Sequence, residues 1–246
     1  MKKILITRSK HNCKALSKFL IAQNYQVFSE PLFKVKKFCG QTNLENIENK
    51  FVINKSLVLI ITSQNALACL SKIKFDKEIL IFAVGKKTAQ AINKLGYINV
   101  HYPLQSCANE LFKLIVNYKF KNNPSLLYLR GEQITFNFKG ILSKHGFKVE
   151  ELIVYKTIKL QNFSQTFCDE VKKNNFEMVI VFSQKSLELF FLLAKKHNLL
   201  EYFVNSCLIG FSDKIVEQAK LLSKENLKFK KIEKLSDNRI LKKFYE

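Results

Sequence analysis

The feature that most constrains the fold is a steady alternation of short apolar runs with longer segments whose apolar residues recur every three or four positions. Runs such as 56–62 and 79–84 have the length of buried strands, and each leads into a turn that carries serine or glycine. Strands that alternate with helices of ten or more residues form parallel β–α–β units. The sequence therefore predicts an α/β fold built on parallel sheets.

The predicted elements cover nearly the whole chain. Strands are expected at 3–8, 26–31, 56–62, 79–84, 98–102, 125–130, 147–158, 178–183, 206–210 and 228–232, with an extended stretch at 32–38. Helices are expected at 11–23, 43–50, 64–73, 86–95, 107–118, 134–145, 163–174, 184–197, 213–222 and near 237–245. Gly96 and Gly146 each precede an aromatic residue, which is typical of a glycine just past a helix end.

An internal repeat links the two halves of this pattern. When Arg8 is aligned with Arg130, the apolar face of the following helix is matched, and Asn24 falls opposite Gly146 at the predicted helix end. Only three of the 41 Lys and Arg residues are arginine, so two of them in register is an informative coincidence. Repeats of this kind indicate a duplicated structural unit.

A second repeat follows the first. Aligning Ser63 with Ser183 places Gln64 opposite Gln184, and each segment is followed by a strand that ends in a glycine turn. The order along the chain is therefore arginine unit, serine unit, arginine unit, serine unit. We expect two related Rossmann-like or flavodoxin-like parallel-sheet domains, with the extended stretches after each arginine unit as the natural connectors.

The formal net charge of +21 allows two interpretations. Abundant lysine with few arginine, glycine and alanine residues looks like an A+T-rich coding bias. A partner with many negative charges, either nucleic acid or a polyanionic small molecule, would also select such a chain. The charge total does not choose between these alternatives.

The sequence lacks the motifs for metal binding, nucleotide binding and catalysis by a nucleophile. The six cysteines include no CxxC pair, the four histidines form no HExxH or close pair, and we assign no metal. Gly85-Lys86-Lys87-Thr88 imitates the end of a phosphate-binding loop, but Leu80 stands where the first glycine should be. There is no GxGxxG and no GxSxG. Neither a nucleotide cofactor nor covalent catalysis by a nucleophile is supported.

The turns that follow the strands are the predicted binding site. Ligands of open parallel sheets sit beyond the carboxyl ends of the strands, where helix N-termini offer free N–H groups to anions. The same serine and threonine residues could instead be ordinary helix caps. The predicted substrate-binding residues are Arg8, Thr62, Ser63, Gln64, Gly85, Lys86, Thr88, Arg130, Gly131, Ser183, Gln184, Lys185, Gly210 and Ser212.

The sequence predicts a cytoplasmic protein. No apolar run approaches the ~20 residues of a membrane helix. The opening segment becomes charged again at Arg8, too soon for the core of a signal peptide.

In their order and spacing, these motifs resemble the uroporphyrinogen-III synthase family. The similar segments are Ile4-Leu5-Ile6-Thr7-Arg8, Leu59-Ile60-Ile61-Thr62-Ser63, Ala83-Val84-Gly85-Lys86-Lys87-Thr88-Ala89, Leu126 to Gly131, Val154-Tyr155-Lys156-Thr157 and Val179 to Ser183. The chain departs from the family at the second glycine turn, where Ser212 or Asp213 replaces a threonine. That departure puts anion binding at Gly210 in doubt.

The resemblance implies a discontinuous domain partition. Residues 1–35 with 160–246 would form one domain and residues 39–153 the other. Residues 36–38 and 154–159 would pair as a two-stranded connector. A contiguous split near residue 120 is the competing partition.

The resemblance also implies a reaction. The family closes the linear tetrapyrrole hydroxymethylbilane to uroporphyrinogen III, inverting ring D and releasing water, without a cofactor. Tyr155 is the implied catalytic residue, because a phenol stays protonated at neutral pH and can donate to the departing hydroxyl. The alternative is that Tyr155 only packs the connector. The expected partner is the polycarboxylate substrate, which the preceding deaminase would hand over. We expect a monomer that binds neither a membrane nor nucleic acid. A basic nucleic-acid-binding or RNA-modifying protein is the alternative function.

Overall fold

The structure is a computed structural model that describes residues 2–9, 13–38, 56–222 and 228–232. Its strands are β1 (Lys3–Ile6), β2 (Gln26–Ser29), β3 (Phe33–Lys37), β4 (Leu57–Ile61), β5 (Leu80–Ala83), β6 (Val100–His101), β7 (Ser125–Gly131), β8 (Lys148–Lys159), β9 (Met178–Ile180), β10 (Cys207–Gly210) and β11 (Lys228–Lys231). Its helices, including the 3₁₀ helices η3 and η4, are α1 (Lys14–Ala22), η3 (Gln64–Ala66), α3 (Leu67–Leu70), α4 (Lys86–Asn93), α5 (Ala108–Val116), α6 (Phe138–Lys144), α7 (Gln165–Lys173), α8 (Gln184–Lys196), η4 (Leu200–Phe203) and α9 (Asp213–Leu222). The predicted helices at 43–50 and near 237–245 lie outside the described residues.

Within the described residues, the predicted strands and helices are confirmed, with two differences. The helix expected at 64–73 is instead the short pair η3 and α3, which ends at Leu70. Beyond the helix end, Ile73 and Phe75 are buried in the same cluster as Leu70. The sequence does not predict η4, because four residues are too few to show a helical period. None of the described helices is long and apolar enough to cross a lipid bilayer.

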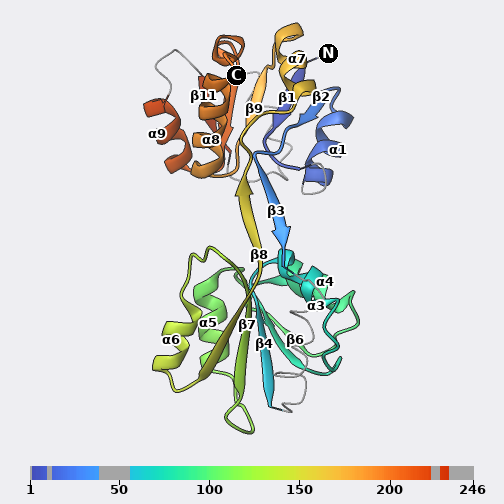
Figure 1. Ribbon diagram of the computed structural model, residues 1–246, viewed down its shortest axis with the longest axis vertical. Helices are drawn as coiled ribbons and strands as arrows, with labels where there is room; N and C mark the ends of the chain where they lie inside the picture. Colours follow the sequence, from blue (N-terminus) through green and yellow to red (C-terminus); the bar gives the residue numbers. More distant parts are fainter. Residues whose placement is uncertain (1, 10–12, 39–55, 223–227, 233–246) are drawn as a thin grey trace. The chain divides into compact units, whose positions relative to one another are not determined.

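Contacts along the chain define two compact units. Unit 1 is Met1–Lys34 with Lys159–Glu246, and unit 2 is Val35–Ile158. In unit 1 the parallel strands lie in the order β11-β10-β9-β1-β2 (Figure 1). β1 pairs with β9, with Ile4 opposite Met178, so the first strand belongs to the same sheet as β9 and does not lie beside β4.

Both faces of the unit 1 sheet are covered by helices. Ile4 and Ile6 face α1 and form one buried cluster with its Leu16 and Leu20. Leu5 points to the opposite face, where α7, α8 and α9 bury a second and larger cluster. Strands buried on both faces have few polar residues, which explains the continuous apolar runs in the sequence.

Unit 2 has the same layered architecture. Its strands lie in the order β3-β8-β7-β4-β5-β6. Leu59 and Ile61 face α3 and α4, while Val58 and Ile60 face α5 and α6. β3 is the neighbour of β8, and the Phe38 N–H donates to the Val154 carbonyl over 2.9 Å.

The strand order confirms the internal repeat. Without β3, the order β8-β7-β4-β5-β6 in unit 2 matches β2-β1-β9-β10-β11 in unit 1. The registers match as well, since Ile6 lies opposite Ile180 and the equivalent Tyr128 lies opposite Ile60. Because the matching strands occur in a different order along the chain, unit 2 is a circular permutation of unit 1.

The helix ends repeat in the same way. In α1 the residue after Asn24 donates back to the Leu20 carbonyl, and in α6 the residue after Gly146 donates back to the Leu142 carbonyl. Asn24 has φ 63° and Gly146 has φ 82°, both in the left-handed region that asparagine and glycine tolerate. The predicted helix stop in register is therefore confirmed at the level of the backbone.

We predict that Gly146→Ala lowers the free energy of unfolding by about 1–2 kcal/mol, because a Cβ is disfavoured at positive φ. Gly146→Asn should cost less, since asparagine already occupies the same conformation at Asn24. Urea unfolding of both variants measures the difference. Space is not the cause, because no atom lies within 4 Å of the added Cβ. Equal losses for the two variants would contradict the prediction.

Candidate functional site

The strand order places two candidate sites, one at each switch point. In unit 1 the direction of winding reverses between β1 and β9, and in unit 2 it reverses between β7 and β4. A parallel sheet of this kind binds its ligand outside the carboxyl ends of these two strands. The predicted site residues fall into two groups. Unit 1 carries Arg8, Ser183, Gln184, Lys185, Gly210 and Ser212, and unit 2 carries Thr62, Ser63, Gln64, Gly85, Lys86, Thr88, Arg130, Gly131 and Tyr155.

The two serines are helix caps. The Ser63 hydroxyl accepts a hydrogen bond from the Asn65 N–H at 3.2 Å at the start of η3. Ser183 accepts from the Ser186 N–H, also at 3.2 Å, at the start of α8. The capping role that the sequence left open is therefore present at both positions.

The two glutamines tie neighbouring turns together. The Gln64 amide donates to the Lys87 carbonyl over 3.1 Å, and the Gln184 amide donates to the Lys214 carbonyl over 3.4 Å. Each contact links the turn after one strand to the start of the helix that follows the neighbouring strand, which is α4 for Gln64 and α9 for Gln184. The side chains are exposed, so their carbonyl oxygens face solvent.

The Gly85 turn is tightly packed and lacks a side-chain cap. A Cβ on Gly85 would lie 2.0 Å from the Ser106 Oγ, so only glycine fits there. The helix α4 that follows has no side-chain cap, and its first residue, Lys86, is exposed. Thr88 is buried at 7% exposure and points away from solvent. An uncapped helix start beside a lysine is favourable for an anion.

The structure corrects the predicted match between Gly85 and Gly210. β10 pairs with β9 so that Gly210 takes the place of Ala83 inside its strand. Ser212 then stands where Gly85 stands: its carbonyl accepts from the Ile215 and Val216 N–H groups, as the Gly85 carbonyl accepts from those of Thr88 and Ala89. The threonine position is thus held by Ile215, and neither Ser212 nor Asp213 replaces it. Gly210 is needed because a Cβ there would lie 2.7 Å from Ile215 Cγ2.

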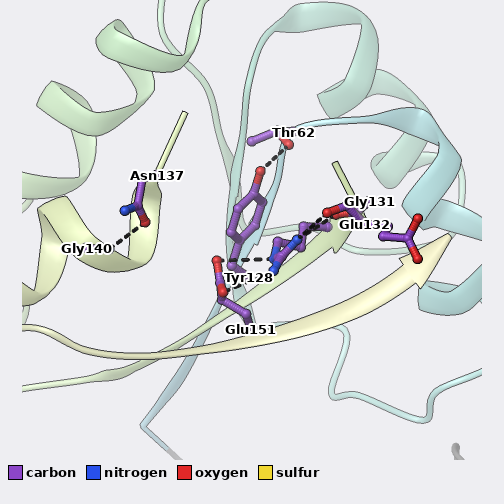
Figure 2. A network of polar contacts seen from close by, with 8 residues as sticks. Thr62, Tyr128, Gly131, Glu132, Asn137, Gly140 and Glu151 are labelled. Atoms are coloured by element: carbon purple, nitrogen blue, oxygen red, sulfur yellow. Dashed lines mark hydrogen bonds and ion pairs between the residues drawn. The ribbon is translucent and has the colours of Figure 1, made fainter. Parts of the chain in front are cut away.

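Arg130 is engaged by the protein itself, and its partners Gly131, Glu132 and Glu151 are labelled in Figure 2. Its Nη1 donates to the Gly131 carbonyl at 2.8 Å and to the Glu132 carbonyl at 3.0 Å, and its Nη2 donates to Glu151 Oε2 at 3.3 Å. Its Nε lies 3.2 Å from Glu151 Oε1, within ion-pair distance but outside hydrogen-bond geometry. Both side chains are mostly buried, at 14% and 18% exposure. Arg130 therefore braces the turn after β7.

Thr62 is also paired within unit 2. Its hydroxyl lies 2.9 Å from that of Tyr128, whose ring is buried at 4% exposure (Figure 2). Burial raises the pKa of Tyr128, while the hydrogen bond with Thr62 opposes this in part. The contact joins β4 to β7 across the switch point.

Tyr155 lies against the turn that Arg130 braces. A Cβ on Gly131 would lie 2.7 Å from the Tyr155 ring and 2.9 Å from its hydroxyl. The Glu132 N–H donates to the Tyr155 carbonyl at 2.9 Å, at a register shift between β7 and β8. Glycine at 131 therefore leaves the space that the Tyr155 ring occupies. In the part of the chain that the structure describes, the Tyr155 hydroxyl has no hydrogen-bond partner.

Arg8 is presented differently. Its guanidinium carbon lies 4.1 Å from the centre of the Phe182 ring, and the residue is exposed. Phe182 in turn stacks on Phe211, with ring centres 5.2 Å apart and planes at 22°. Lys185, at the start of α8, is exposed as well.

Three contacting residues were missed by the sequence: Glu151, Tyr128 and Phe182. Glu151 and Tyr128 lie opposite each other across β8 and β7, in a register that a single sequence does not reveal. The repeat offers one signal by which Glu151 could have been found. It aligns Glu151 with Ser29, so this acidic residue occurs in only one of the two units.

A cysteine–histidine pair elsewhere has no catalytic geometry. Cys168 Sγ lies 3.8 Å from His197 Nδ1, but His197 Nε2 accepts a hydrogen bond from the Phe163 N–H at 3.3 Å. Nδ1 therefore carries the proton and cannot take one from the thiol. Burial also raises the pKa of Cys168, so the thiolate is disfavoured. No group of three or more potential metal ligands occurs among the described residues.

Two sheets of the same strand order, each with polar turns at its switch point, define a duplicated α/β protein with anion-favouring edges. The comparisons identify the family more narrowly. The model "HEM4: Uroporphyrinogen-III synthase HemD" matches residues 2–219, and the chain belongs to that family.

Two solved structures have the same fold. Uroporphyrinogen-III synthetase from Helicobacter pylori 26695 is 18% identical with a TM-score of 0.61, and the match covers 100% of this chain and 99% of that one. A mutant uroporphyrinogen III synthase from the extremely thermophilic bacterium Thermus thermophilus is 14% identical with a TM-score of 0.54, covering 100% and 98%. At these identities the likeness establishes the fold. A search of curated proteins finds no match.

The buried Tyr128 predicts an alkaline loss of stability. Its pKa is raised above the ordinary 10.0, so the unfolded chain ionises first. The contribution of Tyr128 to the free energy of unfolding should stay constant below about pH 9 and fall as the pH rises through about 10 and above. Urea midpoints at pH 8 and pH 11 measure this fall. Tyr128→Phe should make the fall smaller, and an equal fall in both proteins would contradict the assignment.

Proposed function

We infer that the protein closes hydroxymethylbilane to uroporphyrinogen III, with inversion of ring D and loss of water, as a cyclising lyase of heme biosynthesis. The observation that carries this inference is the family match over residues 2–219. The fold agrees with it, since the structural neighbours are uroporphyrinogen III synthases.

The chemistry needs positioning more than a nucleophile. Loss of the ring A hydroxyl gives an azafulvene electrophile, and the substituted carbon of ring D attacks it, giving a spiro intermediate that fragments and recloses. Uncatalysed closure gives the isomer without inversion, so the protein must hold the rings in one arrangement. Orientation alone can account for a large share of catalysis.

We propose Tyr155 as the donor to the departing hydroxyl. Its hydroxyl is unpaired among the described residues, and the glycine at 131 gives the ring a defined seat. A protonated phenol can stabilise the leaving group by general-acid assistance. In this proposal the Arg130–Glu151 pair supports the turn that seats Tyr155.

We propose that exposed cations and free N–H groups at the strand ends bind the eight substrate carboxylates. Lys86, at the uncapped start of α4, and the exposed Lys185 and Arg8 are the candidates. Thr62, Ser63 and Ser183 already have internal partners, so they would contribute through their backbone and position.

The two units are proposed as the two functional domains, in the discontinuous arrangement that the resemblance implies. The two-stranded connector, the monomeric state, the cytoplasmic location and the hand-over from the deaminase stay predictions. No cofactor is proposed.

The alternative of a nucleic-acid-binding protein gains no support. The basic run Lys228-Phe229-Lys230-Lys231, in which an aromatic residue stands among lysines, is the edge strand β11. Phe229 packs against the core, and Lys231 pairs with Asp213. Lysines on an edge strand discourage pairing with other chains, which explains the run without a nucleic acid.

The test of the function is isomer analysis in a coupled assay. Porphobilinogen and a deaminase supply hydroxymethylbilane, and the porphyrins are oxidised and separated. We expect isomer III in the presence of this protein and isomer I without it. Isomer I in both reactions would refute the function.

Tyr155→Phe tests the proposed donor. The substitution removes one hydroxyl and keeps the ring, so the packing against Gly131 should survive. We expect a single-turnover rate lower by roughly 10–100-fold, since solvent replaces part of the assistance. Isomer III should remain the product. An unchanged rate would make Tyr155 structural, and a thermal melt controls for loss of the fold.

A further inference from the structure

The repeat gives Arg8 a matched internal comparison in Arg130. Arg8 comes two residues after the end of β1, and the equivalent Arg130 is the second-last residue of the longer strand β7. The strand beside it places Ser29 opposite Ile6 in unit 1, and Glu151 opposite the equivalent Tyr128 in unit 2. The acidic partner of Arg130 is therefore replaced by a serine at the matching position in unit 1.

This difference changes what each guanidinium can do. Three nitrogen atoms of Arg130 face acceptors of the protein, so few of its N–H groups remain for a ligand (Figure 2). Arg8 is held by the face of the Phe182 ring, 4.1 Å away, and an aromatic face uses none of the in-plane N–H donors. No carboxylate among the described residues pairs with Arg8.

The nearest carboxylate in sequence to Ser29 is committed elsewhere. Glu30 is buried and accepts from the Ser164 N–H at 2.7 Å and from the Ser164 hydroxyl at 2.8 Å. Its carboxylate is held by Ser164, the N-cap residue of α7, and is not available to neutralise Arg8. The charge at the switch point of unit 1 is thus left for an external anion.

We propose that Arg8 binds one carboxylate of a pyrrole side chain in bidentate fashion, that Phe182 positions it, and that Arg130 takes no part in ligand binding. The proposal rests on the proposed function and assigns different roles to the two arginines of the repeat. A planar guanidinium held from one face presents its fork to a carboxylate, and such charge-assisted pairs are the strong ones. Phe211, stacked behind Phe182, keeps that ring in place.

The decisive variant is Ser29→Glu, which rebuilds in unit 1 the counter-ion that unit 2 already has. We expect the new carboxylate to pair with Arg8 and to raise KM by about 10–100-fold, the value of a charge-assisted hydrogen-bonded pair. Ser29→Gln is the matched control, and its KM should stay within twofold of wild type. Arg8→Gln should raise KM as Ser29→Glu does, and the rate at saturation should change little in either.

Two further variants separate positioning from charge. Arg8→Lys keeps the charge but loses the fork, and we expect a KM between those of wild type and Arg8→Gln. Phe182→Leu keeps the apolar bulk but removes the ring face, so KM should rise while thermal stability changes little. Binding of uroporphyrin III, followed by fluorescence, provides a second readout that does not depend on turnover, and it should weaken in the same order.

The outcomes distinguish this proposal from the function. If wild type makes isomer III but Arg8→Gln and Ser29→Glu leave KM and uroporphyrin III binding unchanged, the role of Arg8 is refuted and the function stands. If wild type does not make isomer III, the function fails, and uroporphyrin III binding alone decides whether Arg8 holds a pyrrole carboxylate. Should Ser29→Glu fail to fold, Arg8→Gln and Arg8→Lys carry the test.

Discussion

The pairing of β1 with β9 is the constraint on which unit 1 depends. It joins Ile4 to Met178 in the centre of a parallel sheet, and β2 and β10 are added on either side. Parallel neighbours so distant in the chain cannot be connected by a tight turn. The chain must therefore build something else in between, and unit 2 occupies that interval. The switch point of unit 1, and with it Arg8 and Phe182, exists only once this pair has formed.

The same spatial order serves both units although the chain runs through them differently. Unit 1 begins with the strand that leads to its arginine turn, whereas the repeated part of unit 2 begins with β4 and reaches its arginine turn at β7. The surfaces at the strand ends are nevertheless equivalent, because sheet order and register decide which turns are neighbours. The contacts of Gln64 and Gln184 with the following turns show how closely the equivalence extends to side chains.

Local patterns made much of the fold predictable. The helix stops at Asn24 and Gly146 and the strands before each turn depend on neighbouring residues, and the sequence displays them. The partners of Arg8 and Arg130 could not be predicted from neighbouring residues. Phe182 and Glu151 reach the two arginines through strand registers that the whole sheet determines. The predicted match of Gly210 with Gly85 was wrong for the same reason, because the register of β10 against β9 determines which residues are equivalent.

The candidate site shows the same division between local and long-range information. The types of residue at the turns were foreseeable, since strand ends in a parallel sheet need caps and expose N–H groups. Which of those residues keep free donors depends on their neighbours in space. Thr62 is taken by Tyr128 and Arg130 by Glu151, so two predicted ligand contacts became internal contacts.

The discontinuity of unit 1 has a consequence for synthesis on the ribosome. Residues 1–34, with β1 and its neighbour β2, emerge first, but β9, the other neighbour of β1, follows only when all of unit 2 has been made. At roughly 5–20 residues per second, the edge of β1 that pairs with β9 waits on the order of 10 s uncovered. Unit 2 can fold within that interval without it. The amino-terminal segment is thus the part of the nascent chain that most needs shielding from other unfolded chains.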